Sequence, residues 1–334
     1  MQAGLGIVYP ITNLLNQWIW CVYPRISNKE KKDFLRNHLP VDVDSRVCME
    51  NKSLHYPFTS RDSSRYIDIA IQEEINSGRG SKHNGVYLDL SDLSINSSDN
   101  PNFRKMLPLT LDWLSKRGLD LSREPIEIAS FGHSINGGLW IDKKAATNVK
   151  GLFAAGEVAG GPHGADRLGG NMMVTCQVFG ARAGKYAALY SQKKKMFPSV
   201  DHKDINNVKK EIFTLHKKDI DEKYFRKKLQ EDLNRGLLVR RSAKSLNICL
   251  DTIRKIKAEI TQANEGENIN FLNLELMNLL ILGELMTMTA FQRKESRGSH
   301  FRMDFLKQDD KNLCVTQIAQ KKKGKPNYSF YKFH

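Results

Sequence analysis

Apolar and polar residues follow two different periods along the chain, and the change of period divides it into segments. Residues 85–93 alternate between apolar and polar positions, as a strand with one buried face does. Elsewhere apolar residues recur three and four positions apart, which is typical of an amphipathic helix. This spacing predicts helices over residues 63–75, 203–218, 221–234, 237–262 and 270–294. The last of these is strongly apolar and is expected to lie in a core.

The rest of the first half of the chain predicts short strands separated by turns. Residues 7–24 are apolar enough for one or two short strands, and residues 125–142 for a strand, a turn and a second strand. Residues 149–157 lack polar alternation, which favours a strand that is buried on both faces and ends in an acid. Further predictions are a short helix at 28–40, a helix around 107–116 that breaks near Pro108, and a flexible basic tail at 321–334.

The chain of 334 residues has a formal net charge of +15, which is unevenly distributed. Residues 193–257 carry 19 Lys and Arg against 9 Asp and Glu, and residues 291–334 carry 11 against 4. Binding to nucleic acid is one interpretation of such a basic module. Because no basic motif with interleaved aromatic residues occurs, we favour lysine-rich solvated helix faces and expect no nucleic-acid partner.

The five cysteines lie far apart, and no two of them form a CxxC pair. This arrangement argues against a zinc or iron–sulfur site in the chain, so no metal is predicted, and it favours a reducing compartment. The apolar run at residues 6–24 contains two prolines and three amide side chains, so it is not expected to span a membrane. No signal peptide is evident, and a cytoplasmic location is expected.

A glycine-dense loop, "GPHGADRLGGN" at residues 161–171, leads into a segment of small and apolar residues that predicts a helix. Glycine lets the backbone N–H groups approach a ligand closely, because no Cβ stands in the way. The start of a helix adds unpaired N–H donors and a partial positive charge. The loop is therefore expected to cradle an anion or a polar ring.

Four motifs, in this order along the chain, resemble the succinate dehydrogenase and fumarate reductase flavoprotein family, which includes L-aspartate oxidase. "SRDSSRYIDIAIQEEINSGRG" at residues 60–80, followed by "VYLDL", resembles the family's capping-domain segment. "HSINGG" at 133–138 resembles its His-x-x-x-Gly-Gly turn, and "GLFAAGEVAGGPHGADRLGGN" at 151–171 resembles its "HGANRLGGN" loop and helix start. "RKESRGSHFRMDF" at 293–305 resembles its C-terminal signature.

The N-terminal dinucleotide-binding fingerprint of that family, GxGxxG after a strand, does not occur in this sequence. The chain therefore resembles the C-terminal portion of such a flavoprotein. We expect the N-terminal FAD-domain half either to be supplied by another polypeptide or to be missing from a truncated reading frame. A non-catalytic remnant, or an interaction subunit that uses the basic helices, is the alternative from another functional class.

The resemblance implies a mixed α+β and α/β fold: the C-terminal part of a Rossmann-like FAD-binding domain with an inserted α+β capping domain, followed by a helical bundle. It implies five segments: an FAD-domain remnant strand at 1–24, the capping domain at 25–128, the C-terminal FAD-domain segment at 129–192, the helical bundle at 193–294 and a C-terminal tail at 295–334.

Three residues match the family's catalytic positions. The resemblance implies that Arg61 delivers a proton and that His133 and Arg167 bind the carboxylates of a substrate. Because a guanidinium does not release a proton readily, Arg61 needs a neighbouring relay, for which Asp62 and Arg65 are the nearest candidates in the sequence. The alternatives are a helix-start pair of Arg61 with Asp62, a structural histidine, and a local ion pair of Arg167.

The remaining matched positions would hold FAD. Glu157 corresponds to the acid that binds the ribityl chain of the flavin, and the helix start corresponds to the amides that face the flavin ring. The residues of this helix start are Gly169, Gly170, Asn171 and Met172.

The implied activity is hydride transfer between flavin N5 and a C–C bond of a small carboxylate substrate, and an L-aspartate oxidase-like enzyme is the closest enzymatic alternative. An iron–sulfur electron-transfer subunit, and through it the inner face of a membrane, are the further partners that the resemblance implies. Two departures put fumarate and succinate in doubt as substrates. Tyr23 stands where the family has a capping-domain histidine, and the Thr/Glu pair that follows it has no counterpart in residues 25–50.

Overall fold

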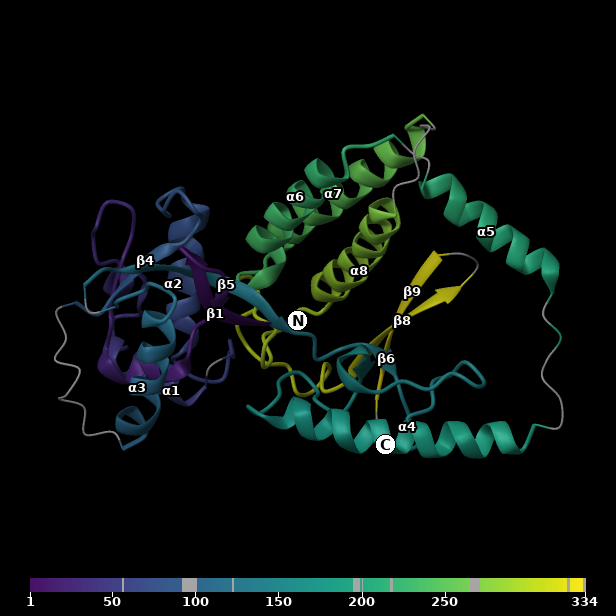
Figure 1. Ribbon diagram of the computed structural model, residues 1–334, viewed down its shortest axis with the longest axis horizontal. Helices are drawn as coiled ribbons and strands as arrows, with labels where there is room; N and C mark the ends of the chain where they lie inside the picture. The colour runs from purple at the N-terminus through teal and green to yellow at the C-terminus, as the bar shows by residue number, and fades with distance from the viewer. Residues whose placement is uncertain are drawn as a thin grey trace.

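The computed structural model places most of the chain in three bodies that lie side by side (Figure 1). The residues described are 1–55, 57–91, 101–121, 123–194, 199, 201–216, 219–264, 271–322 and 325–332. One body is a sheet with helices, the second is a helical bundle, and the third is an extended segment that contains the glycine-dense loop.

An antiparallel sheet of five strands, in the order β2-β1-β5-β4-β3, organises the first body. Its strands are β1 (Gln2–Tyr9), β2 (Asn13–Leu14), β3 (Arg25–Ser27), β4 (Val86–Asp89) and β5 (Ile126–Ser134). The predicted strands at 85–93 and 125–142 are confirmed where the structure describes them. Strand β5 pairs with β4 at its beginning and with β1 along its whole length, so segments from three parts of the chain share one sheet. The division into domains stays a prediction.

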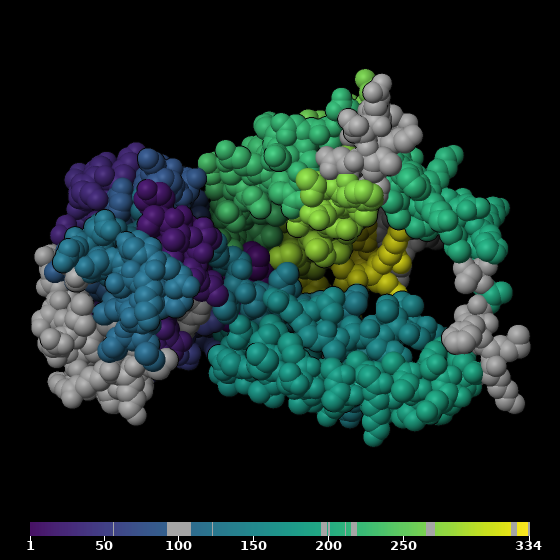
Figure 2. Space-filling model, viewed as in Figure 1, coloured from purple at the N-terminus to yellow at the C-terminus, as the bar shows by residue number. Residues whose placement is uncertain are grey.

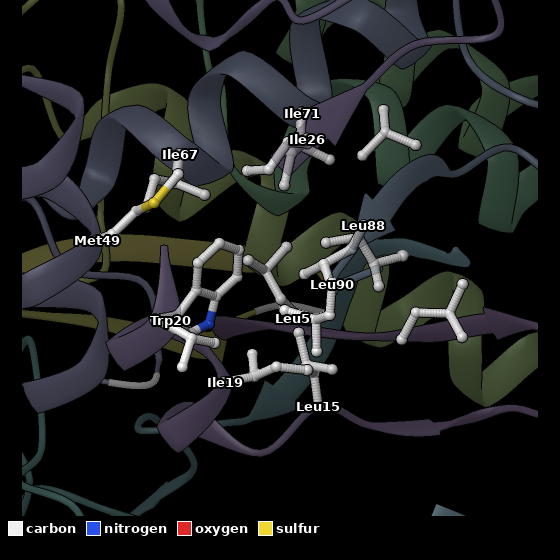
Figure 3. Close-up of a cluster of buried hydrophobic side chains, with 14 of the residues drawn as sticks. Leu5, Leu15, Ile19, Trp20, Ile26, Met49, Ile67, Ile71, Leu88 and Leu90 are labelled. Atoms are coloured by element: carbon white, nitrogen blue, oxygen red, sulfur yellow. The ribbon is translucent and has the colours of Figure 1, made fainter. Parts of the chain in front are cut away.

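Three helices pack on this sheet and enclose the largest apolar core of the described residues. They are α1 (Ser45–Leu54), α2 (Arg65–Asn76) and α3 (Pro101–Ser115). The helical spacing of Ile67 and Ile71 places both on the buried face of α2, as the sequence predicts. Figure 3 shows the side chains that meet in this core, among them Leu5, Leu15, Ile19, Trp20, Ile26, Met49, Ile67, Ile71, Leu88 and Leu90.

Two local expectations for this body are wrong, and that of short strands over residues 7–24 holds for the end of β1 and for β2 but not beyond them. The apolar run after β2 is a 3-10 helix (Gln17–Val22), because the Asn16 side chain accepts a hydrogen bond from the Trp18 amide and starts a turn. Residues 28–40 contain only a 3-10 turn (Leu35–His38), since the Asn28 side chain binds the backbone of the loop before it. Helix α3 continues through Pro108, which is exposed, so water can satisfy the carbonyl that the proline leaves unpaired.

The helices of the second half begin and end close to the predicted helix positions. The bundle contains α6 (Glu222–Leu233), α7 (Ala243–Gln262) and α8 (Leu272–Gln292), with a π-helical turn (Asn234–Leu238) before α7, and α5 (His202–His216) lies to one side of it (Figure 1). Ser242 and Ser245 form a capping box at the start of α7. Apolar side chains of α6, α7 and α8 make a second core, which includes Leu229, Ile256 and Leu280.

Helix α8 is long and apolar enough to cross a membrane, a test that core helices of soluble proteins also pass. Leu276 and Leu280 are fully buried against the neighbouring helices, whereas Ile281 and Leu282 are about half exposed. The predicted core helix is therefore confirmed on one face, and its other face is apolar and exposed.

The third body has little core of its own. It consists of β6 (Leu139–Trp140), β7 (Ala159–Gly160), a 3-10 turn (Gly156–Val158) and α4 (Asn171–Gln192). No residue of α4 is buried, and Met173, Val174, Val178 and Leu189 expose much of their apolar surface. In Figure 2 this helix stretches along one edge of the molecule, and a gap separates its outer end from the bundle.

Two predictions fail in this body and at the C-terminal end. Residues 149–157 form no regular strand, because Phe153 pairs with Ala146 only in an isolated bridge and no further strand of the described chain continues that pairing. The predicted flexible tail contains a hairpin, β8 (Thr316–Lys322) and β9 (Lys325–Tyr331), which lies between α8 and α4 (Figure 1). Tyr328 and Phe330 alternate with polar residues there, which is the pattern of a strand.

Candidate functional site

Four segments that are far apart in the sequence meet at the glycine-dense loop. Ser60 donates its backbone N–H to the Gly298 carbonyl at 2.7 Å, and Ser299 donates its N–H to the Ala165 carbonyl at 3.1 Å. Gln2, at the start of β1, donates from Nε2 to the Asp166 carboxylate at 2.6 Å. These bonds bring the predicted residues Arg61, His133 and Arg167 into one neighbourhood.

Arg167 and His133 contact each other directly. The Arg167 Nη2 lies 2.9 Å from the His133 Nε2. Because a guanidinium can only donate, the imidazole must accept through Nε2 and carry its proton on Nδ1. His133 lies near the end of β5, which fixes its backbone, and the loop presents Arg167 to it. A guanidinium fork such as that of Arg167 can bind a carboxylate through two parallel hydrogen bonds.

The environment holds His133 in this neutral form. Burial lowers the pKa of His133 below its ordinary value of 6.5, and the positive charge of Arg167 lowers it further, although Glu157 opposes the shift. Protonating His133 is thus harder in the folded protein than in the unfolded chain. The His133 contribution to stability is present above pH 6.5 and is lost as the pH falls through the lower, folded-state pKa.

We expect an NMR titration of the His133 Cε1 proton to give a midpoint below 6.5 in the chain. The variant Arg167→Gln should move that midpoint upward, because it removes the neighbouring positive charge and leaves burial unchanged. A midpoint at or above 6.5, or one that is the same in the wild type and in Arg167→Gln, would contradict the contact between the two side chains.

Arg61 lies in the loop before α2 and makes an ion pair with Asp166, with 3.0 Å between Nη2 and Oδ2. This partner was missed by sequence reasoning, which sees only neighbours along the chain. Asp62, the expected partner, instead contacts the His55 ring and caps the Ser64 amide. Arg65 donates to backbone carbonyls and to the Tyr66 hydroxyl. A single signal was available: Asp166 stands where the resembling loop has asparagine.

Glu157 is the last residue of the 149–157 segment, where the chain forms a 3-10 turn, and its side chain is exposed. Its Oε1 accepts a hydrogen bond from the Ile135 amide at 2.7 Å, directly after β5. The acid therefore joins the end of the strand that carries His133 to the loop that carries Arg167.

The helix start and its glycines are open to a ligand. Gly170, the N-cap residue of α4, has a φ of 81°, a backbone conformation that favours glycine. Glycine has no side chain that could cap the first amides of the helix. A Cβ built at Gly169 or Gly170 would meet no atom within 4 Å, so the space beside them is free. By contrast, Gly138 is required by packing, since a Cβ there would fall 2.2 Å from the Val158 carbonyl oxygen. Asn171 and Met172 form the first turn of α4, and the residues present fit the edge of a flavin ring.

Tyr23 is not brought to this site. It donates to Glu50 at 2.7 Å within the first body. In the described part of the chain no group of three or more His, Cys, Asp or Glu residues is arranged to hold a metal ion.

Comparison with known proteins places the chain in a family. Residues 45–173 match the family model for an FAD binding domain, and residues 226–333 match the model for the fumarate reductase flavoprotein C-terminus. A fumarate reductase (CoM/CoB) subunit of Methanothermobacter marburgensis is 38% identical over 243 residues, which cover 71% of this chain and 43% of that protein. L-aspartate oxidase of Bacillus subtilis is 30% identical over 285 residues, which cover 85% of this chain and 48% of that protein.

Solved structures show the same fold. The structure of Mycobacterium smegmatis Sdh1 in complex with UQ1 superposes with a TM-score of 0.81 at 24% identity, covering all of this chain and 55% of that one. The chain belongs to the fumarate reductase and succinate dehydrogenase flavoprotein family, a family of FAD-dependent oxidoreductases. FAD is the cofactor that its binding domain implies. The chain spans less than half the length of the curated relatives described above.

Proposed function

We propose that this chain carries the substrate-binding part of an FAD-dependent oxidoreductase that transfers a hydride between flavin N5 and a C–C bond of a small carboxylate. The observation that supports this most is the pairing of Arg167 with His133 at 2.9 Å, next to the Arg61–Asp166 ion pair. The two contacts are linked through the chain, because Asp166 and Arg167 are adjacent residues of the loop before α4.

The residues divide the work by their chemistry. Arg167 would bind one carboxylate of the substrate through its planar fork, and the His133 ring beside it would bind the other. Arg61 is half exposed and pairs with Asp166, which directly precedes Arg167, and its role would be to pass a proton to the carbon that does not receive the hydride. Because a guanidinium does not release a proton readily, this role requires a neighbouring relay. Polarisation of the substrate by these charges is the main source of rate enhancement in such a site.

FAD supplies the hydride chemistry when it is bound. The Gly169 and Gly170 backbone and the Met172 amide at the start of α4 would stabilise negative charge at the ring edge, while the Asn171 amide donates to the Leu168 carbonyl at 3.2 Å. Glu157 would accept hydrogen bonds from vicinal hydroxyls, since a carboxylate has lone pairs for two of them.

Other polypeptide is needed to complete the site. The exposed apolar residues of α4 and of the loops before it, among them Val158 and Leu168, form a surface that the remainder of an FAD-binding domain would cover. The fumarate reductase relatives are named as subunits, which supports a multi-subunit enzyme. We propose that a further partner is an iron–sulfur electron-transfer subunit, through which the protein would sit in the cytoplasm at the inner face of a membrane.

FAD titration tests the cofactor assignment. The chain by itself should bind FAD weakly, because it offers the ring-edge contacts but no GxGxxG turn for the pyrophosphate. Co-expression with an N-terminal FAD-domain polypeptide of a relative should give a yellow complex with stoichiometric flavin. A colourless complex would overturn the cofactor assignment, whereas tight binding to the chain alone would overturn the proposed need for a second polypeptide.

An L-aspartate oxidase-like activity is the second candidate, since the match to the Bacillus subtilis enzyme covers 85% of this chain. Supplying the flavin-containing complex with succinate, fumarate and L-aspartate in turn separates the two enzymes. A complex that binds flavin but turns over none of the three would instead support a non-catalytic role for the chain.

A further inference from the structure

We propose that Asp166 is a positioning residue that holds the Arg61 guanidinium over the substrate loop and thereby pins the first body to that loop. The role rests on the proposed function of Arg61. The two residues come from different bodies: Arg61 precedes α2, which packs on the five-stranded sheet, whereas Asp166 belongs to the loop before α4.

Each oxygen of the Asp166 carboxylate has one partner, an ion pair at Oδ2 and a hydrogen bond at Oδ1. Its Oδ2 lies 3.0 Å from the Arg61 Nη2, and its Oδ1 accepts a hydrogen bond from the Gln2 Nε2 at 2.6 Å. Gln2 is itself fixed, because its Oε1 accepts from the Ser134 hydroxyl at 3.1 Å. The Asp166 side chain is only 6% exposed, so it has little freedom to turn toward solvent.

A glycine of the C-terminal signature makes room for this carboxylate. A Cβ at Gly298 would fall 2.6 Å from the Asp166 Cβ, and the φ of Gly298 is 56°. The same glycine accepts the Ser60 amide through its carbonyl, so it fixes the residue before Arg61 as well as the wall behind Asp166. Ser299 then binds the Ala165 carbonyl through both its amide and its hydroxyl, at 3.1 and 2.9 Å. The backbone on both sides of the ion pair is thereby tied down.

Asp166 also bears on substrate binding, because its negative charge lies beside a site for an anion. It follows Ala165 and directly precedes Arg167, the residue assigned to bind the substrate carboxylate. The carboxylate therefore opposes ground-state binding of a carboxylate substrate while it orients the group that acts on that substrate. A residue with only a structural role would not have both effects.

The contact can be tested on the chain alone, without flavin or activity. Arg61 is labelled with phenylglyoxal, and the modification rate is read by mass spectrometry of peptides. In Asp166→Asn, Arg61 should react about three- to tenfold faster than in the wild type, because a charged partner is lost at a half-exposed position. Arg65, which donates to backbone carbonyls, serves as the internal reference, and Asp166→Glu, which keeps the charge, should react like the wild type.

Equal rates for Arg61 in the wild type and in Asp166→Asn would overturn the proposal. Circular dichroism and thermal melting show whether the variant is folded. If it is not, the wild type is labelled at low salt and in about 1 M NaCl. Screening should then speed the labelling of Arg61 relative to Arg65, and an unchanged ratio would overturn the proposal equally.

The second readout uses the flavin-containing complex. Asp166→Asn should lower kcat by about tenfold, because Arg61 loses its orientation, and should lower KM at the same time, because a repulsive charge is removed. A fall in kcat with an unchanged or raised KM would contradict the role. If the wild-type complex has no activity at all, the proposed function fails, while the labelling result still decides whether Asp166 holds Arg61.

Discussion

Replacing Arg167 with lysine should lower the turnover of the flavin-containing complex by about 10²- to 10³-fold. Lysine keeps the positive charge but cannot present two parallel N–H donors to a carboxylate. It would also leave the His133 Nε2 without the donor that lies 2.9 Å from it in the wild type. Both losses act on the bound substrate, so stopped-flow measurement of flavin oxidation by substrate should report the full effect.

The matched control is Arg182→Lys. Arg182 lies on the exposed surface of α4, where its guanidinium contacts the Lys143 carbonyl and the Phe179 ring. This variant changes the same chemical group in the same body and should keep wild-type turnover. If Arg167→Lys and Arg182→Lys have equal rates, Arg167 does not bind the substrate.

The largest effect on stability should come from Lys52→Met in the first body. Lys52 of α1 donates to Asp68 of α2 at 2.6 Å, and neither side chain is exposed to solvent. Removing one partner of such a buried pair leaves the other charge uncompensated, which typically costs about 3–5 kcal/mol. Urea denaturation, followed by tryptophan fluorescence because Trp20 lies in the same body, would measure the loss.

The stability of the Lys52→Met variant should also depend on pH, in a direction that the buried pair determines. Burial already raises the pKa of Asp68, which Lys52 opposes, so the variant should raise that pKa further. The folded variant then binds a proton more tightly than its unfolded chain does. Its free energy of unfolding should therefore be highest at low pH and fall as the pH rises from the unfolded-state pKa to the folded-state pKa.

A double variant, Lys52→Met with Asp68→Leu, is the control for the pair itself. Replacing both charges with apolar side chains of similar volume is often neutral or stabilising. We expect it to recover most of the stability and to lose the pH dependence. A single variant as stable as the wild type would show that the pair is not buried in solution.

The periodicity of apolar residues predicted the helices correctly, but it failed for segments whose structure depends on contacts with residues far away in the sequence. Helices α2, α6 and α7 were predictable because each carries an apolar stripe within its own sequence, and α8 because it is a long, strongly apolar segment. The segment 149–157 has the composition of a buried strand, but strand formation depends on neighbours that its own residues do not specify. The C-terminal hairpin was missed because lysines obscured the alternation of Tyr328 and Phe330.

The candidate site shows the same limit. Arg61, His133 and Arg167 could be found because each stands in a motif, and the structure brings all three together. The acid that pairs with Arg61 could not be found by spacing. Asp62 is adjacent in sequence, but its oxygens are used by His55 and the Ser64 amide, and Asp166 reaches Arg61 through the packing of four separate segments.

Strand β5 makes the geometry of the site sensitive to events at a distance. Ile126 and Ile128 are anchored in the core of the first body, and His133 lies farther along the same strand. About five residues of strand span about 17 Å at roughly 3.3 Å each, and β1 pairs with β5 over this length, so the two strands would move together. A tilt of about 5° at the core would carry the imidazole through about 1.5 Å, an error of the size that can cost about 10²-fold in rate. Substitutions in the core around β4 and β5 therefore belong among those that tune turnover.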